Sequence, residues 1–251
     1  MVNGISAQLD SGILRLELDK PARRNAVDTP MLRELRDRLG DATHESVRAV
    51  LLTGRGPGFC SGGDLTGGDT DGAVYAANEV VQAITALPKP VVAGVRGAAA
   101  GFGCPLALAC DLVVAERSAF FQLAFVNVGL MPDGGTSALL PAAVGRARAA
   151  RMAFLAEKIT AATAFEWGMI SHLVNDDDYD TELTAVLGAL RQGPTASYGW
   201  IKQALRTATL GALADAQRIE AQGQTALKDT ADFRTRVRAF RARRRPSTAA
   251  P

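Results

Sequence analysis

Apolar and polar side chains alternate at the start of the chain, and short apolar runs follow. Between residues 13 and 18, leucines alternate with Arg15 and Glu17, which predicts a strand with one face toward water. Ser11-Gly12 separates this strand from residues 7–10, so we expect a hairpin. Further buried strands are predicted by short apolar runs at residues 49–52, 91–95, 112–115 and 120–121.

Apolar residues recur at helical spacing elsewhere. Leucines from Leu32 to Leu39 form the apolar stripe of a helix that Thr29 caps and Pro30 opens. Residues 66–72 hold little apolar material and predict a loop. The other expected helices cover residues 73–87, 105–109, 146–157, 161–168, 180–191, 195–207, 211–227 and 233–241.

No Pro- or Ser-rich linker divides the strand-rich first part from the helical last part. We therefore expect one α/β fold, with a core in residues 1–195 and a helical region in residues 196–251 that packs on the core and on neighbouring subunits. The chain has 251 residues, of which 47% are hydrophobic, so it can bury a large core. Its formal net charge of +2 predicts no general attraction to nucleic acid.

Two glycine-rich stretches stand out, TGRGPGFCSGGDL at residues 53–65 and GVRGAAAGFGCPLALA at residues 94–109. Glycine lets another molecule approach the main chain closely. Asp64 is placed to cap a following helical turn, so that the amides of Gly62 and Gly63 would face an electron-rich group. One such stretch is typical of a surface turn, whereas two of the same kind favour a binding site.

Cys60, Cys104 and Cys110 are odd in number and form no CxxC pair. We interpret them as small reduced core residues of a cytoplasmic protein. Cys104 and Cys110 lie on an apolar helix without an adjacent base, so we do not expect them to act as nucleophiles.

His44 and His172 lie far apart without other ligands at metal-binding spacing, so we expect no metal site. No signal-peptide pattern opens the chain. The longest apolar stretch, residues 97–114, contains Pro105 and Asp111, which favours a buried helix and strand over a membrane span.

Six motifs follow one another along the chain: KPARRNAVD, VRAVLLTGRGPGFCSGGDL, LPKPVVAGVRGAAAGFGCPLALACDLVVA, NVGLMPDGG, AFEWGMISHLV and VRAFRARRRP. Their order and spacing resemble the crotonase family, the enoyl-CoA hydratases and isomerases, over nearly the whole chain. The resemblance implies a spiral of β–β–α turns in residues 1–195. It also implies that the C-terminal helices build a homotrimer, often stacked into a homohexamer.

The resemblance implies an oxyanion hole made of the backbone amides of Gly63 and Phe102. These amides would stabilise the enolate that forms when a proton leaves or joins the carbon next to a thioester carbonyl. One such donor contributes roughly 3 kcal/mol where it has been measured in other enzymes. The side chain matters little for this role, although the ring of Phe102 would narrow the acyl channel.

The resemblance implies no separate cofactor, because coenzyme A is part of the acyl-CoA substrate. Arg23 and Arg24 would reach its phosphates, and the backbone around Ser61 would receive the adenine. Phe240 and Arg243 match a Phe and a Lys that in relatives cover the CoA of a neighbouring subunit. The implied CoA-binding residues are Arg23, Arg24, Ala26, Ser61, Gly62, Asp64, Leu65, Phe240 and Arg243. The arginines are equally typical of solvated charged segments.

The sequence departs from the family pattern at the two glutamates that activate water in hydratases. Pro105 and Phe125 occupy those positions, and neither can transfer a proton. Asp133 matches the position of a catalytic aspartate in isomerases. An alternative interpretation is that Asp133 caps the following helix, because Pro-Asp-Gly is also a turn and cap sequence. Glu79 is a more distant candidate and is typical of a solvated helix face.

Three functions remain open. The first is an acyl-CoA isomerase with Asp133 as base and Gly63 and Phe102 as oxyanion donors. The second is a protein that binds acyl-CoA without catalysis. The third is a hydratase with an unusual set of residues.

Overall fold

The computed structural model describes residues 4–65 and 70–243; for residues 70, 71 and 243 it describes the backbone alone. Its main sheet has six strands in the order β1-β2-β3-β4-β6-β9. Their bounds are β1 Ile5–Asp10, β2 Ile13–Leu18, β3 Ala49–Gly54, β4 Val91–Val95, β6 Leu112–Glu116 and β9 His172–Val174. Only β1 and β2 pair antiparallel, as the predicted hairpin, and the other neighbours pair parallel.

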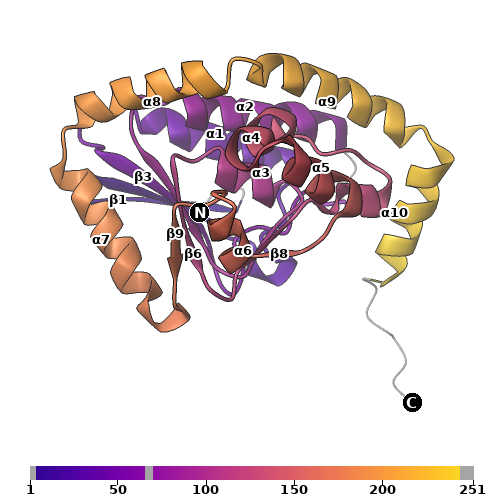
Figure 1. Ribbon diagram of the computed structural model, residues 1–251, viewed down its shortest axis with the longest axis horizontal. Coiled ribbons are helices and arrows are strands. Elements are labelled where there is room, and N and C mark those ends of the chain that lie inside the picture. The colour runs from indigo at the N-terminus through magenta and orange to yellow at the C-terminus, as the bar shows by residue number, and fades with distance from the viewer. Residues whose placement is uncertain (1–3, 66–69, 244–251) are drawn as a thin grey trace.

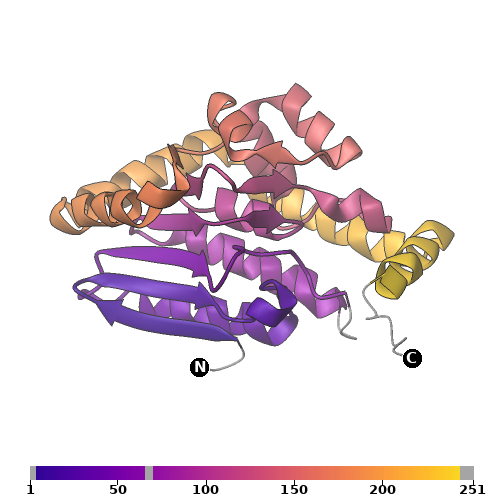
Figure 2. The same cartoon turned by 90° about the horizontal axis from the view of Figure 1, so that it is seen from below.

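Helices cover both faces of this sheet, which is why its central strands read as continuous apolar runs. In β3, Val50 and Leu52 join the core under α1 (Thr29–Asp41) and α2 (Thr70–Ala86). Ala49 and Leu51 point to the other face, where α7 (Tyr179–Gln192) packs. Figure 2 shows the β1–β2 hairpin along one edge of the molecule. α10 (Ala231–Arg243) lies at the opposite end of the molecule.

A second, smaller sheet joins three short strands in the order β5-β7-β8. These are β5 Ala98–Ala100, β7 Phe120–Gln122 and β8 Ile159–Thr160. Of these three strands, the sequence predicted only β7. β5 carries the second glycine stretch, so its pairing with β7 fixes the position of the loop that follows it.

The last third of the chain is helical, as predicted. In Figure 1, α8 (Thr195–Thr209) and α9 (Leu213–Lys228) run along one margin of the molecule, and α10 turns down at its end. The remaining helical segments are η1 Pro21–Arg23, α3 Gly103–Leu108, η2 Ala124–Val128, α4 Thr136–Val144, α5 Arg146–Leu155, α6 Ala161–Glu166 and η3 Asp176–Asp178. The division of the chain near residue 195 stays a prediction.

Two local predictions were wrong. Asp28, not Thr29, caps α1, because its carboxylate accepts from the amide of Met31 at 3.0 Å. Residues 70–72 belong to α2 rather than to a loop, and residues 66–69 of that predicted loop lie outside the described residues. The carboxylate of Asp64 forms an ion pair with Arg23 at 2.8 Å; the turn that Asp64 was predicted to cap falls on residues 66–69, outside the described residues.

Within the described part of the chain, no helix is long and apolar enough to span a membrane. Among the same residues, no group of three or more His, Cys, Asp and Glu side chains could hold a metal ion.

Candidate active site

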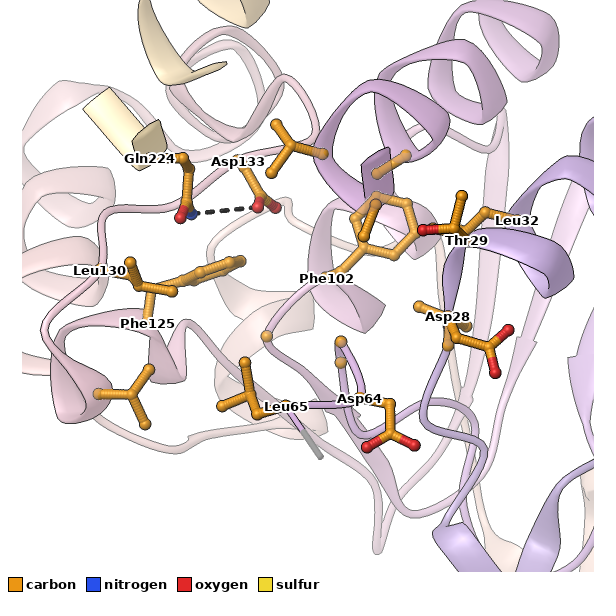
Figure 3. Close-up of a pocket in the computed structure, with 18 of the residues that line it drawn as sticks. Asp28, Thr29, Leu32, Asp64, Leu65, Phe102, Phe125, Leu130, Asp133 and Gln224 are labelled. Carbon is orange, nitrogen blue, oxygen red and sulfur yellow. Dashed lines mark hydrogen bonds between the residues drawn. The ribbon is translucent and has the colours of Figure 1, made fainter. Parts of the chain in front are cut away.

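A cavity of about 460 Å³ lies between the two glycine loops, η2 and the C-terminal helices. Figure 3 shows it with Phe102 and Asp64 on one side and Asp133 and Phe125 on the other. The first glycine loop, the start of α1 and the first half of α2 form one wall. The segment between η2 and α4, together with α9 and α10, forms the opposite wall. Elements that are far apart in sequence therefore enclose one site.

The two glycine loops lie against each other because their residues lack side chains at the contact. Gly62 has a φ of 96°, which favours glycine. A Cβ atom there would lie 3.0 Å from the carbonyl oxygen of Ala100 and 3.3 Å from the amide nitrogen of Phe102. The Cys60 amide donates to Ala98 at 2.9 Å, and the Ala100 amide donates back to Cys60 at 2.8 Å. The sequence thus brings both loops to the edge of the cavity.

The backbone amides of Gly63 and Phe102, the predicted oxyanion donors, lie at this contact. The neighbouring amides are used, since Asp64 donates to Val27 at 2.8 Å and Gly101 to Gln122 at 2.9 Å. Within the described ranges, the amides of Gly63 and Phe102 donate to no carbonyl oxygen. Both residues line the cavity, and a Cβ atom on Gly63 would meet nothing within 4 Å.

Asp133 lines the same cavity from the segment before α4 (Figure 3). Its Oδ2 accepts a hydrogen bond from Gln224 at 3.1 Å, while its buried Oδ1 has no partner among the described residues. Burial, together with the negative charge of Glu220 and against a smaller lowering by Lys228, raises the pKa of this carboxyl to about 7. A carboxyl with these properties can both accept and return a proton near neutral pH.

Asp133 does not cap α4 with its side chain, so that alternative is wrong. The capping group is Glu220 of α9, which is fully buried. Its two carboxylate oxygens accept from the amides of Gly135 and Ser137, each at 2.7 Å. The carboxylate of Asp133 is thereby left to the cavity, while its backbone carbonyl accepts from Thr136.

The wall beside Asp133 is apolar at the two positions where the resemblance implied glutamates in a hydratase. Phe125 lines the cavity and is 9% exposed. Pro105 is buried on α3. A Cβ atom on Gly134 would lie 2.8 Å from the ring of Phe102 and 3.4 Å from Pro105, so this side is closely packed as well as apolar.

The residues expected to bind CoA divide into two groups. Those that line the cavity are Ser61, Gly62, Asp64, Leu65 and Phe240. Arg23 stands beside it through its ion pair with Asp64. Arg24 and Ala26 are not among the lining residues; the Arg24 carbonyl accepts from Ser61, and Ala26 is buried. The side chain of Arg243 lies outside the described residues.

α10 covers the cavity of its own chain. Phe233 and Phe240 line the cavity, and Arg241 donates from two nitrogens to the carbonyl of Leu65, at 2.9 and 2.6 Å. The backbone of α10 also lies against Gly129, where a Cβ atom would be 3.0 Å from Phe233. The C-terminal helix therefore holds the first glycine loop directly.

Sequence reasoning missed the polar residues of α9. Gln217, Glu220 and Gln224 are at most 2% exposed, whereas Ile219 on the same helix is 54% exposed. The signal was present as polar residues at positions i, i+3 and i+7, which lie on one helix face. Lys228, one turn further along α9, also lines the cavity.

Glu79 and the three cysteines lie as their non-catalytic interpretations predicted, on a solvated face and in the core, and Asp111 has a structural role. Glu79 is paired with Arg36 at 2.6 Å on an exposed face. Asp111 accepts from the amide of Val91 and from Lys202, each at 2.7 Å. The three cysteines are buried free thiols, and burial raises the pKa of Cys60 and Cys104 to about 12.

Comparison with known proteins agrees with this geometry. Residues 8–249 match the family model described as enoyl-CoA hydratase/isomerase. A protein of Rhodobacter capsulatus named as a probable enoyl-CoA hydratase is 40% identical, with 96% of each chain covered. The 1,2-epoxyphenylacetyl-CoA isomerase of Escherichia coli K12 is 37% identical, with 98% of each chain covered.

Among solved structures, an enoyl-CoA hydratase from Mycobacterium avium subsp. paratuberculosis superimposes with a TM-score of 0.92 at 39% identity. The match covers 95% of this chain and 99% of that one. Fold, sequence and family model coincide over nearly the full length, and the chain therefore belongs to the enoyl-CoA hydratase/isomerase, or crotonase, family.

Proposed function

We propose that the protein isomerises unsaturated acyl-CoA thioesters, with Asp133 as the base. The observation that carries the proposal is the state of the Asp133 carboxyl. It is buried, one oxygen is unpartnered among the described residues, and it lines the same cavity as Gly63 and Phe102, whose amides donate to no carbonyl oxygen in the described ranges. A second group for proton transfer is not needed, because one carboxylate can take a proton from one carbon and return it to another.

In the proposed reaction, Oδ1 of Asp133 accepts a proton from C2 of a 3-enoyl-CoA. The electrons of the C2–H bond form a C1–C2 double bond, and the carbonyl electron pair moves to the thioester oxygen. The amides of Gly63 and Phe102 stabilise that oxygen. Asp133 then returns the proton to C4, the carbonyl forms again, and the double bond lies between C2 and C3.

The apolar side chains beside Asp133 disfavour the addition of water. A hydratase must orient and deprotonate a water molecule, and Phe125 and Pro105 offer no group for this. The names of the relatives do not decide between the two reactions, because one is a probable hydratase and another is an acyl-CoA isomerase. The proposal therefore rests on the side chains of this cavity.

Isomerisation should depend on pH through Asp133. Only the ionised carboxylate can accept the proton, so kcat/KM should rise with pH and reach half its maximum near pH 7, where burial holds the pKa. An aspartate with an ordinary pKa would place the midpoint of the pH–rate profile at about pH 4. The measurement is the conversion of a 3-enoyl-CoA to the 2-enoyl product between about pH 5 and pH 9.

Crotonyl-CoA is the matched control substrate, and its hydration should be negligible throughout that range. Rapid hydration of crotonyl-CoA together with no isomerisation would overturn the proposal in favour of an atypical hydratase. An isomerisation rate that is flat with pH would remove Asp133 as the base.

We also propose that the chain assembles as a homotrimer or homohexamer. Several large apolar side chains are exposed on the single chain, and two helices carry more than one of them. On α8 these are Trp200, Ile201 and Leu205, and on α5 they are Phe154 and Leu155. Apolar groups gathered in this way favour an interface with other subunits.

A further inference from the structure

Gln224 is held in one orientation beside Asp133. Its side chain is 2% exposed, and its Nε2 donates to the carbonyl of Met131 at 2.6 Å and to Oδ2 of Asp133 at 3.1 Å. A carbonyl can only accept, so the contact with Met131 identifies this atom as the amide nitrogen. Both hydrogens of the amide are therefore committed to the segment that carries Asp133 (Figure 3).

The close approach of α9 makes this contact possible. A Cβ atom on Gly223 would overlap the sulfur of Met131. Glycine at this position lets the helix lie directly on the segment before α4, and Gln224 then reaches both Met131 and Asp133. One turn earlier, Glu220 fixes the other side of the same segment through Gly135 and Ser137.

We infer that Gln224 is the positioning residue of the Asp133 carboxylate: it holds Oδ2 and leaves the buried Oδ1, which has no partner among the described residues, as the atom that accepts the proton. The inference deepens the proposed isomerase reaction and rests on it for the role of Oδ1. An N–H donor on one carboxylate oxygen prevents rotation of the group and favours its ionised form. Gln224 would thereby fix the orientation of the Asp133 carboxylate and keep it ionised, so that it can accept a proton.

The charges around Asp133 make that donor important. Glu220 of α9 bears two hydrogen bonds on its carboxylate and disfavours ionisation of Asp133, while Lys228 of the same helix favours it. Across the cavity the charged lining residues are Asp28, Arg33 and Asp64. Gln224 is the neutral donor in direct contact, so its removal should shift the balance toward the protonated acid.

The test is Gln224→Met, which keeps the length of the side chain and removes the donor. We expect kcat for the 3-enoyl-CoA to fall by about 10- to 100-fold with KM changed by less than about threefold, because misplacement of a reacting group affects the chemical step. The midpoint of the pH–rate profile should rise by about one unit. Gln224→Leu serves the same purpose if the methionine variant does not fold.

Gln217→Met is the matched control. Gln217 is buried to the same degree on the same face of α9, but it bonds Gln82 at 2.7 Å and the carbonyl of Asn78 at 3.4 Å instead of Asp133. It should share any loss of helix stability while leaving the pH midpoint at the wild-type value. A shift of equal size in both variants would mean that Gln224 acts only through the packing of α9.

A readout independent of turnover separates this inference from the proposed function. Carbon-13 NMR of protein labelled at the aspartate carboxyl carbons, with Asp133→Asn for assignment, gives the pKa of Asp133 directly. A higher value in Gln224→Met than in wild type and Gln217→Met supports the positioning role, even if wild type fails to isomerise and the proposed function falls. An unchanged value and an unchanged rate in Gln224→Met overturn the inference, whether or not wild type is an isomerase.

Discussion

Asp133→Asn should lower kcat for a 3-enoyl-CoA by about 10³-fold, because general acid–base catalysis contributes about 10²- to 10⁴-fold in other enzymes. Asparagine keeps the size of the side chain and can neither accept nor return the proton. Binding should be little changed, since the amides of Gly63 and Phe102 are untouched. Steady-state kinetics with a 3-enoyl-CoA, and calorimetric titration with a medium-chain acyl-CoA, measure the two effects separately.

Glu79→Gln is the matched control, because Glu79 is an exposed carboxylate paired with Arg36, and it should keep the wild-type rate. If Asp133→Asn also keeps that rate, Asp133 is not the base. If neither wild type nor the variant isomerises but both bind acyl-CoA, the protein is a non-catalytic member of the family. Loss of binding in both would remove acyl-CoA as the ligand.

The same variant should also reveal how much the ionisation of buried Asp133 lowers the free energy of unfolding. The pKa of the carboxyl rises from its ordinary value of 3.8 to about 7 on folding, so the folded state keeps the proton longer than the unfolded chain. The associated stability is present below about pH 4, falls as pH rises, and is lost above about pH 7. A shift of about three units corresponds to about 4 kcal/mol. Asparagine does not titrate, so the stability of the variant should not decline in this way as pH rises. The same unfolding measurement would show that the variant is folded when it is inactive.

Gly62→Ala should lower kcat by about 10²-fold, through the backbone rather than through any side chain in contact with substrate. The new methyl group would lie 3.0 Å from the Ala100 carbonyl and 3.3 Å from the Phe102 amide, at a φ of 96°. Relief of both conflicts moves the two loops apart and misaligns one amide donor. Loss of one such donor costs about 10²- to 10³-fold in other enzymes. Kinetics with a 3-enoyl-CoA, together with melting curves, measure the effect.

Gly58→Ala is the control for this variant. It lies in the same loop, and its Cβ atom would come no closer than 3.8 Å to another atom, the amide nitrogen of Ala98. It should keep both the rate and the melting temperature. A Gly62→Ala variant that folds and turns over at the wild-type rate would show that the contact between the loops does not serve the reaction.

Short-range patterns predicted most of the main sheet and the long helices. The sequence predicted β3 because both faces of the strand are buried, which makes residues 49–52 a continuous apolar run. β5 was not, because three alanines become a strand only by pairing with β7, about twenty residues later in the chain. β8 has two residues, too few to form a pattern.

The candidate site was only partly predictable, for a related reason. The glycine loops and Asp133 lie in local sequence motifs, so the resemblance to the family identified them. Glu220 and Gln224 act on groups more than eighty residues away, and their partners are visible only in three dimensions. The cap of α4 illustrates this: Pro-Asp-Gly is a typical capping sequence, yet the capping carboxylate comes from α9.

A crystal structure of Asp133→Asn with an intact 3-enoyl-CoA would test the central claim most directly. The account predicts the thioester oxygen within about 3 Å of the amide nitrogens of both Gly63 and Phe102. It also predicts the side chain of residue 133 within about 3.5 Å of C2 and close to C4. A thioester oxygen out of reach of either amide, or another side chain lying between residue 133 and both carbons, would contradict it.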